Sequence, residues 1–180
     1  MTNIVLLGGN GYLGRELSKQ WLARNPQAAL YIVSRSGNNQ FQNSQVYNLK
    51  ADVTDFNAVN ALLPDQVDYI VDLIGAPAKD PQQLININQK PADVMQKIAE
   101  QKQVKSMGII GGILGPKSFV TIKAKLIRQL KQSTIPLAYV EPTLVYGAGR
   151  SDSMAKMVPL LKFFGIFSRK LKPVTVTSVV

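Results

Sequence analysis

The sequence contains no cysteine and no histidine. Without cysteine the chain can form no disulfide and offers no thiolate as nucleophile or metal ligand, which is typical of a protein from a reducing compartment. Without histidine, imidazole bases and histidine-ligated metals are excluded as well. We therefore expect a cytoplasmic protein with no resident metal ion.

Long hydrophobic runs are missing too. The longest apolar run, residues 107–114, contains three glycines and is far shorter than the ~20 residues that span a bilayer. Met1-Thr2-Asn3 leads directly into an apolar segment without a charged region or a cleavage site, so we expect no signal peptide. We expect no integral membrane contact. With 180 residues and 46% hydrophobic content, residues 1–180 suit one domain without a separate substrate domain.

Acidic residues are scarce in the second half of the chain. Residues 1–90 hold seven basic and seven acidic residues, whereas residues 91–180 hold fourteen basic and four acidic ones, which accounts for the net charge of +10. Such asymmetry is compatible with a nucleic acid, an anionic surface or an acidic partner. Because the basic residues are scattered among apolar ones and no nucleic-acid motif occurs, we favour a solvated surface and expect no nucleic-acid partner. A protein partner or a homodimer remains open.

Strand and helix patterns alternate along the chain. The predicted strands cover residues 4–7, 30–33, 45–49, 67–74, 104–110, 135–140 and 173–180. The first predicted helix ends near Arg24. The other predicted helices cover residues 56–63, 81–102 (interrupted near Pro91), 118–132 and 153–164. A repeated strand–helix pattern predicts an α/β fold, namely a doubly wound parallel sheet.

The most informative segment follows the first predicted strand. Gly8, Gly11 and Gly14 recur at three-residue spacing where that strand turns into a helix. The amides of the first helical turn and the positive end of the helix dipole then form a phosphate site. Gly8 permits the tight turn, Gly11 lets backbone approach a pyrophosphate, and Gly14 allows close packing of the helix. Arg35 lies twenty-one residues beyond Gly14, where such units contact the ribose.

These glycines, Asp52, Lys123 and the segment from Glu141-Pro142 to Tyr146-Gly147 form an ordered set. Together they resemble the short-chain dehydrogenase/reductase superfamily in its atypical and extended branches, with likeness to NmrA-like and epimerase-like NAD(P)-binding proteins. The resemblance covers nearly the whole chain. It implies a single Rossmann-like, NAD(P)-binding domain, with NADP as the cofactor and NAD as the alternative.

The resemblance also implies which residues contact the cofactor. Arg35 occupies the place where NADP-preferring relatives put a basic residue against the 2′-phosphate, and a guanidinium offers bidentate donors to phosphate. Asp52 and Val53 resemble the pair that contacts adenine. The complete implied cofactor site is Gly8, Asn10, Gly11, Tyr12, Leu13, Gly14, Ser34, Arg35, Ser36, Asp52, Val53, Ile74, Gly75, Lys123, Pro142 and Leu144.

The chain departs from this family at the catalytic positions. Phe119 stands where the family has its tyrosine, and Gly111 or Gly112 stands where it has its serine. Phenylalanine cannot donate the proton that carbonyl reduction needs. Lys123 is retained, either to bind the nicotinamide ribose or as one exposed lysine among several. Tyr146 is the candidate replacement acid, although packing is the commoner role of such a residue, so the candidate catalytic residues are Lys123 and Tyr146.

Three functions are compatible with this pattern. The first is an oxidoreductase that passes hydride from NADPH to a small acceptor that needs no enzyme-supplied proton, such as a quinone. The second is a non-catalytic dinucleotide-binding redox sensor, regulator or assembly factor. The third, a sugar-nucleotide epimerase or dehydratase, ranks last because it needs the missing tyrosine.

Overall fold

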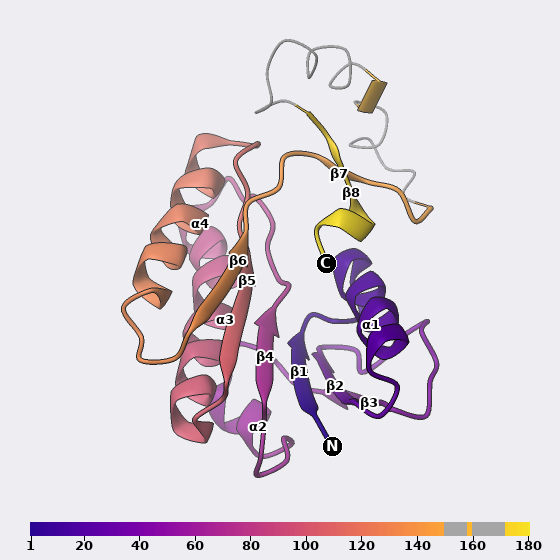
Figure 1. Ribbon diagram of the computed structural model, residues 1–180. Coiled ribbons are helices and arrows are strands. Elements are labelled where there is room, and N and C mark those ends of the chain that lie inside the picture. Colours follow the sequence, from indigo (N-terminus) through magenta and orange to yellow (C-terminus); the bar gives the residue numbers. More distant parts are fainter. Residues whose placement is uncertain (150–157, 160–171) are drawn as a thin grey trace.

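The computed structural model describes residues 1–149, 158–159 and 172–180 (Figure 1). The helix predicted for residues 153–164 therefore lies outside the described residues, apart from 158–159. Within the described parts, six parallel strands form one sheet in the order β3-β2-β1-β4-β5-β6. This arrangement confirms the predicted α/β fold with a doubly wound, Rossmann-like parallel sheet in a single domain.

The strands and helices alternate as the sequence predicts. The sheet strands are β1 (Asn3–Leu7), β2 (Ala29–Ser34), β3 (Val46–Lys50), β4 (Tyr69–Asp72), β5 (Ser106–Ile110) and β6 (Leu137–Val140). The α-helices are α1 (Tyr12–Arg24), α2 (Phe56–Asn60), α3 (Pro81–Lys102) and α4 (Lys117–Leu130). A separate two-stranded sheet pairs β7 (Val145–Tyr146) with β8 (Val174–Thr175), and a short 3₁₀ helix, η2 (Val176–Ser178), follows.

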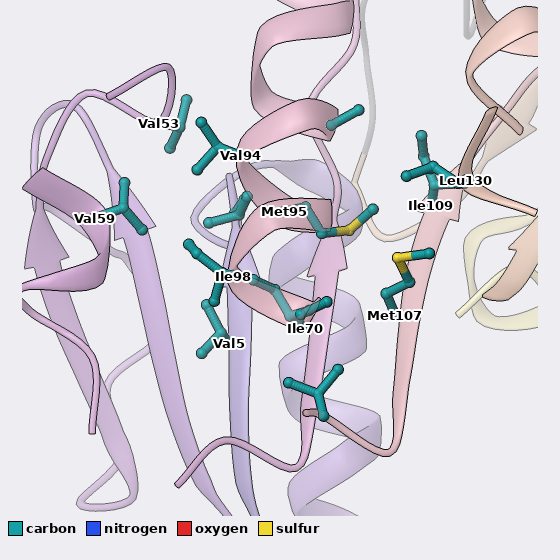
Figure 2. Close-up of a cluster of buried hydrophobic side chains, with 14 of the residues drawn as sticks. Val5, Val53, Val59, Ile70, Val94, Met95, Ile98, Met107, Ile109 and Leu130 are labelled. Carbon is teal, nitrogen blue, oxygen red and sulfur yellow. The ribbon is translucent and has the colours of Figure 1, made fainter. Parts of the chain in front are cut away.

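The two faces of the sheet are covered by different helices. Alternate residues of β1 point to opposite sides, so that Ile4 and Leu6 pack with Leu22 of α1, whereas Val5 and Leu7 join the larger core. This larger core lies between the sheet and helices α2 to α4, and Figure 2 shows its residues converging on Met95 and Ile98 of α3. Burial on both faces explains why β1 and β2 read as nearly continuous apolar runs, whereas the edge strands β3 and β6 are more exposed.

The position of the site follows from the strand order. β1 pairs in register with β2 on one side and with β4 on the other. The chain winds away from β1 in both directions, and in open parallel sheets the crevice at such a reversal point, outside the carboxyl ends of the strands, receives ligands. The loops that follow β1, β2, β3 and β4 all lie at this edge.

Two expectations about local structure are wrong. Helix α3 runs without a break through Pro91, although proline supplies no amide hydrogen. The helix buries Leu84, Ala92, Met95 and Ile98 on either side of the proline, and this packing outweighs one missing backbone bond. The strand predicted for residues 173–180 is reduced to β8, because β-branched composition records a preference whereas pairing needs a neighbouring strand.

No helix in the described ranges combines the length and the apolarity needed to cross a membrane.

Candidate functional site

Two cavities meet at the carboxyl edge of the sheet and share Gly8 and Gly75. The first has a volume of about 440 Å³ and lies between the glycine-rich loop, the turn after β4 and residues 148–149. The second has a volume of about 800 Å³ and extends past the ends of β2 and β3 to helix α3. Each is of the size of a small-molecule site, and together they offer an elongated site with two compartments.

The glycine-rich loop is shaped by contacts that exclude side chains. Gly8 has a φ of 74°, and a Cβ there would lie 2.6 Å from Ile74 Cγ1. A Cβ on Gly14 would overlap the backbone of Gly9. Gly11 is the N-cap residue of α1 and has no side chain to accept from the first-turn amides. The loop therefore brings bare backbone and the positive end of a helix dipole to the first cavity, as the glycine spacing predicts.

Polar contacts join this loop to the segment after β2. Asn10 Nδ2 donates a hydrogen bond of 3.1 Å to the Asn38 carbonyl. The Ser34 hydroxyl accepts from Gly37 N at 3.1 Å, and the Ser36 hydroxyl accepts from Asn38 N at 3.1 Å. These bonds place Ser34, Arg35 and Ser36 along the wall of the second cavity.

Two cations and one carboxylate share the second cavity. Asp52 Oδ1 accepts from both the amide and the hydroxyl of Thr54 at 2.9 Å. These two bonds, together with the charges of Arg35 and Lys90, hold the pKa of Asp52 below its ordinary value. Arg35, Asp52 and Lys90 all line the second cavity, so this end of the site carries a net positive charge.

The turn after β4, residues 73–76, forms the wall between the cavities and is called the β4 turn below. Ile74 N donates to Asp72 Oδ1 at 2.9 Å, and Lys123 Nζ donates to the Ile74 carbonyl at 2.8 Å. Asn88 Nδ2 donates to the Ala76 carbonyl at 2.9 Å. Lys123 is 2% exposed, so the alternative that it is one exposed surface lysine is wrong.

Burial shifts the pKa values of both charged groups behind the β4 turn. Burial raises the pKa of Asp72 to about 6, although the Lys123 charge and the Ile74 amide oppose the shift. Burial lowers the pKa of Lys123, and the nearby Asp72 charge opposes that shift. Each group therefore keeps its charge at neutral pH in part because of the other.

The positions where the resemblance would place a catalytic serine and a catalytic tyrosine carry no side-chain proton donor, because they are occupied by glycine and by Phe119. A Cβ on Gly111 would lie 2.9 Å from both Glu141 Cγ and Ile127 Cδ1, whereas a Cβ on Gly112 would lie 3.6 Å from Phe119 Cε1. Gly112 is thus the position that faces Phe119 and has room for a side chain. Tyr146 packs with Leu114 against the small apolar cluster of Leu144 and Val158.

The structure brings together most, but not all, of the residues expected at the cofactor site. The expected residues that line one or both cavities are Gly8, Asn10, Gly11, Tyr12, Leu13, Gly14, Ser34, Arg35, Ser36, Asp52, Val53, Ile74 and Gly75. The expected cofactor contacts that line neither cavity are Lys123, Pro142 and Leu144, and the candidate catalytic residue Tyr146 lines neither cavity as well. Lys123 lies directly behind Gly75, and Leu144 is buried in its own cluster.

Several lining residues were not identified from the sequence. They are Arg15, Val33, Leu73, Thr54, Ala76, Gln83, Asn86, Ile87, Lys90, Pro91, Ala148 and Gly149. Arg15 is next to the glycine motif and folds back to donate from Nη1 to the Asn10 carbonyl at 2.9 Å. The residues of α3 follow a helical spacing from Gln83 to Lys90, but nothing in that spacing indicates that this stretch faces a ligand.

The family model for the NAD dependent epimerase/dehydratase family matches residues 4–111, which include the glycine-rich loop, the ends of β2 and β3 and the β4 turn. The chain belongs to the NAD dependent epimerase/dehydratase family. The expected epimerase-like, short-chain dehydrogenase/reductase kinship is confirmed, whereas the NmrA-like kinship stays a prediction. Membership of this family supports binding of a nicotinamide dinucleotide, and the side-chain-free cradle at Gly8 and Gly14 fits its pyrophosphate.

Three solved structures share the fold of this chain. The Bordetella bronchiseptica enzyme WbmG, in complex with NAD, is 16% identical with a TM-score of 0.72, over 90% of this chain and 58% of WbmG. WbmH of the same organism, in complex with NAD⁺, is 17% identical with a TM-score of 0.72, over 98% of this chain and 69% of WbmH. Escherichia coli serine dehydrogenase is 14% identical with a TM-score of 0.64, over 97% and 95% of the two chains.

At these identities the likeness establishes the fold alone. The chain spans less than two thirds of the length of WbmG, so activities of the longer enzymes do not transfer to it as findings. Among curated proteins, none matches this sequence.

Proposed function

We propose that this protein binds NADP(H) in preference to NAD(H) and is an oxidoreductase that passes hydride to a small acceptor. The observation that carries the dinucleotide preference is the pair of cations, Arg35 and Lys90, around the second cavity. An acidic residue at the end of β2 would favour the ribose hydroxyls of NAD, whereas a guanidinium there favours a 2′-phosphate.

Each part of the dinucleotide has candidate contacts in the two cavities. The glycine-rich loop would hold the pyrophosphate, with Arg15 and the helix dipole of α1 supplying positive charge. Ser34, Arg35 and Ser36 would hold the 2′-phosphate. Asp52 and Val53 line the second cavity beside them and would contact the adenine.

The reaction is inferred from the side chains near Gly112. NADPH supplies a hydride when it is bound, and a carbonyl acceptor would also need a proton from the protein. Phe119 and Gly112 supply none, and Tyr146 packs in an apolar cluster that lines neither cavity. Acceptors that take hydride and obtain their proton from solvent, such as quinones, suit this environment best.

The test of the dinucleotide preference is a thermal-shift titration with NADP, NADPH, NAD and NADH. A ligand at a hundredfold excess over its dissociation constant stabilises by about 2.7 kcal/mol, so the phosphorylated pair should raise the melting temperature more. Arg35→Glu should abolish this difference. Lys125→Glu makes the same charge change at an exposed residue of helix α4 and should keep the difference. Equal shifts for all four ligands in the wild type would contradict the preference.

The test of the reaction is NADPH oxidation with a panel of quinones and simple aldehydes. We expect turnover with at least one quinone and none with aldehydes, and loss of turnover in Arg35→Glu at low NADPH. Tight binding without oxidation by any acceptor would favour the second candidate function, a non-catalytic redox sensor, regulator or assembly factor, for which the absent proton donors at Gly112 and Phe119 also argue. Conversion of a nucleotide sugar would favour an epimerase or dehydratase, the third candidate, which family membership keeps open.

A further inference from the structure

Three buried side chains from three elements bind the backbone of the β4 turn. Both backbone polar groups of Ile74 are bound by charged side chains, the amide by Asp72 of β4 and the carbonyl by Lys123 of α4. Asn88 of α3 binds the Ala76 carbonyl. Leu73 N donates to the Leu7 carbonyl at 3.0 Å, so the turn is also attached to the start of the glycine-rich loop.

The other side of the β4 turn is the wall of the candidate site. Leu73 and Gly75 line the first cavity, and Ile74, Gly75 and Ala76 line the second. A Cβ on Gly75 would lie 2.8 Å from Lys123 Nζ, which places the ammonium group directly behind this wall. Ile74 in turn packs against Gly8. A shift of the turn would therefore change both cavities and the glycine-rich loop together.

The pair of charges behind the turn is not arranged for stability alone. Asp72 is 0% exposed and Lys123 is 2% exposed, and burying two charges costs solvation free energy that the attraction between them seldom exceeds. The ion pair in direct contact among the described residues is Lys105 with Asp68, so Asp72 and Lys123 interact across a longer distance. Asp72 Oδ2 is buried and accepts no hydrogen bond from any described residue.

We propose that Lys123 is a positioning residue that acts through the Ile74 carbonyl, holding the β4 turn in the conformation that both cavities require, with Asp72 as its buried counter-charge. The inference depends on the proposed function, because its ligand is NADP. It differs from a direct role of Lys123 on the nicotinamide ribose in one measurable respect. A misplaced turn weakens ligands of the second cavity, whereas loss of a ribose contact weakens only ligands that carry the nicotinamide ribose.

The experiment compares Lys123→Met with the wild type by calorimetric titration of two probes. One probe is NADP, and the other is adenosine 2′,5′-bisphosphate, which has the adenosine phosphates but no nicotinamide ribose. We expect Lys123→Met to weaken both by about fivefold or more, in the range of ordinary coupling between neighbouring sites. Lys125→Met, two residues further along α4 and exposed, is the matched control and should bind both probes as the wild type does.

A second variant separates positioning from folding. Lys123→Met leaves the Asp72 carboxyl buried without its counter-charge, which lowers the melting temperature. The double variant Asp72→Asn/Lys123→Met removes that charge as well, and its melting temperature should return toward the wild-type value. Its affinity for both probes should stay low, because the Ile74 carbonyl still has no donor.

The possible outcomes are distinct. If only NADP is weakened and the bisphosphate is not, Lys123 acts on the ribose and the inference is overturned. It is also overturned if neither probe is weakened, or if the double variant regains affinity together with its melting temperature. A wild-type protein that binds neither probe would instead refute the proposed function and remove the inference with it.

Discussion

Two regions of the chain build the site in different ways. The first region is residues 1–76, up to the end of the β4 turn, and the second is residues 77–149. The first region supplies the glycine-rich loop, the ends of β2 and β3 and the turn itself, largely through backbone and glycine geometry. The second region supplies side chains: those of α3 line the second cavity, and Lys123 supports the turn from behind. Under the proposed function, the pyrophosphate would be held by backbone conformation in the first region, whereas hydride transfer would depend on the side chains that the second region offers.

The largest effect on stability and binding is expected from a side chain added to the glycine-rich loop of the first region. In Gly14→Ala the new Cβ would overlap the backbone of Gly9, which cannot rotate away as a side chain can. We expect a loss of about 3 kcal/mol in the free energy of unfolding and no measurable NADP binding. Urea denaturation and calorimetric titration measure the two quantities.

The control lies in the second region. In Gly112→Ala the new Cβ would meet Phe119 Cε1 at 3.6 Å, an ordinary contact, so stability and NADP binding should change little. If Gly112→Ala were as damaging as Gly14→Ala, the contrast between the regions would disappear.

The next effect compares two buried carboxyl groups that lie just before and at the end of β4. Asp68 Oδ2 accepts from Asn3 N at 2.8 Å, and this bond, with Lys105, lowers the pKa of Asp68. A lowered pKa means that the carboxylate stabilises the fold above its unfolded value of 3.8 and that this stability is lost as the pH falls through the folded value. Asp68→Asn should therefore cost about 1–3 kcal/mol at pH 7.

Asp72 should behave in the opposite sense. Its pKa is raised from 3.8 to about 6, so its contribution to stability is present below pH 4 and is lost as the pH rises through about 6. Because removing the carboxylate also leaves Lys123 buried without its counter-charge, we predict only the pH dependence: between pH 4 and pH 7 the difference in the free energy of unfolding between Asp72→Asn and the wild type should shift in favour of the variant, by at most about 3 kcal/mol. Denaturation across this pH range measures it. A difference that does not change across this pH range would show that Asp72 does not titrate in it.

A smaller effect on stability and binding is expected where the two regions meet, at Gly75 and Lys123. In Gly75→Ala the new Cβ would lie 2.8 Å from Cε and Nζ of Lys123, the end of a flexible side chain. We expect a cost of about 1 kcal/mol together with weaker NADP binding. Lys123→Met in the same chain should relieve the collision but not restore affinity. Full recovery of affinity would show that the turn needs space and not the hydrogen bond from Lys123.

The smallest effect concerns the basic surface of the second region. Lys117 and Lys125 are exposed on α4, and replacing either by glutamine should change stability by no more than about 0.5 kcal/mol. NADP affinity at physiological salt should be nearly unchanged, because neither lysine lines either cavity and salt screens exposed charges. A marked loss of affinity at low salt would show that this surface attracts the polyanionic ligand.

Much of the fold follows from local sequence pattern. The alternation of apolar strand runs with helical periodicity is a property of short segments, and so is the strand–glycine–helix signature at Gly8 to Gly14. The failures have different causes. The continuity of α3 through Pro91 depends on the packing of both flanks, and the shortening of the last strand depends on which strand lies beside it. Neither can be read from neighbours along the chain.

The same division applies to the site. From the sequence alone came the parallel α/β fold, the place of the glycine-rich loop and the absence of a serine and a tyrosine at the usual catalytic positions, because each depends on residue type and short-range spacing. Only the tertiary structure brought Lys90 to the cavity of Arg35 and Asp52, buried Lys123 behind Gly75 and placed Tyr146 in an apolar cluster. Those outcomes depend on how α3, α4 and the loops pack on the sheet. This packing decides which side chains are buried and which charged groups from distant parts of the chain reach the cavities.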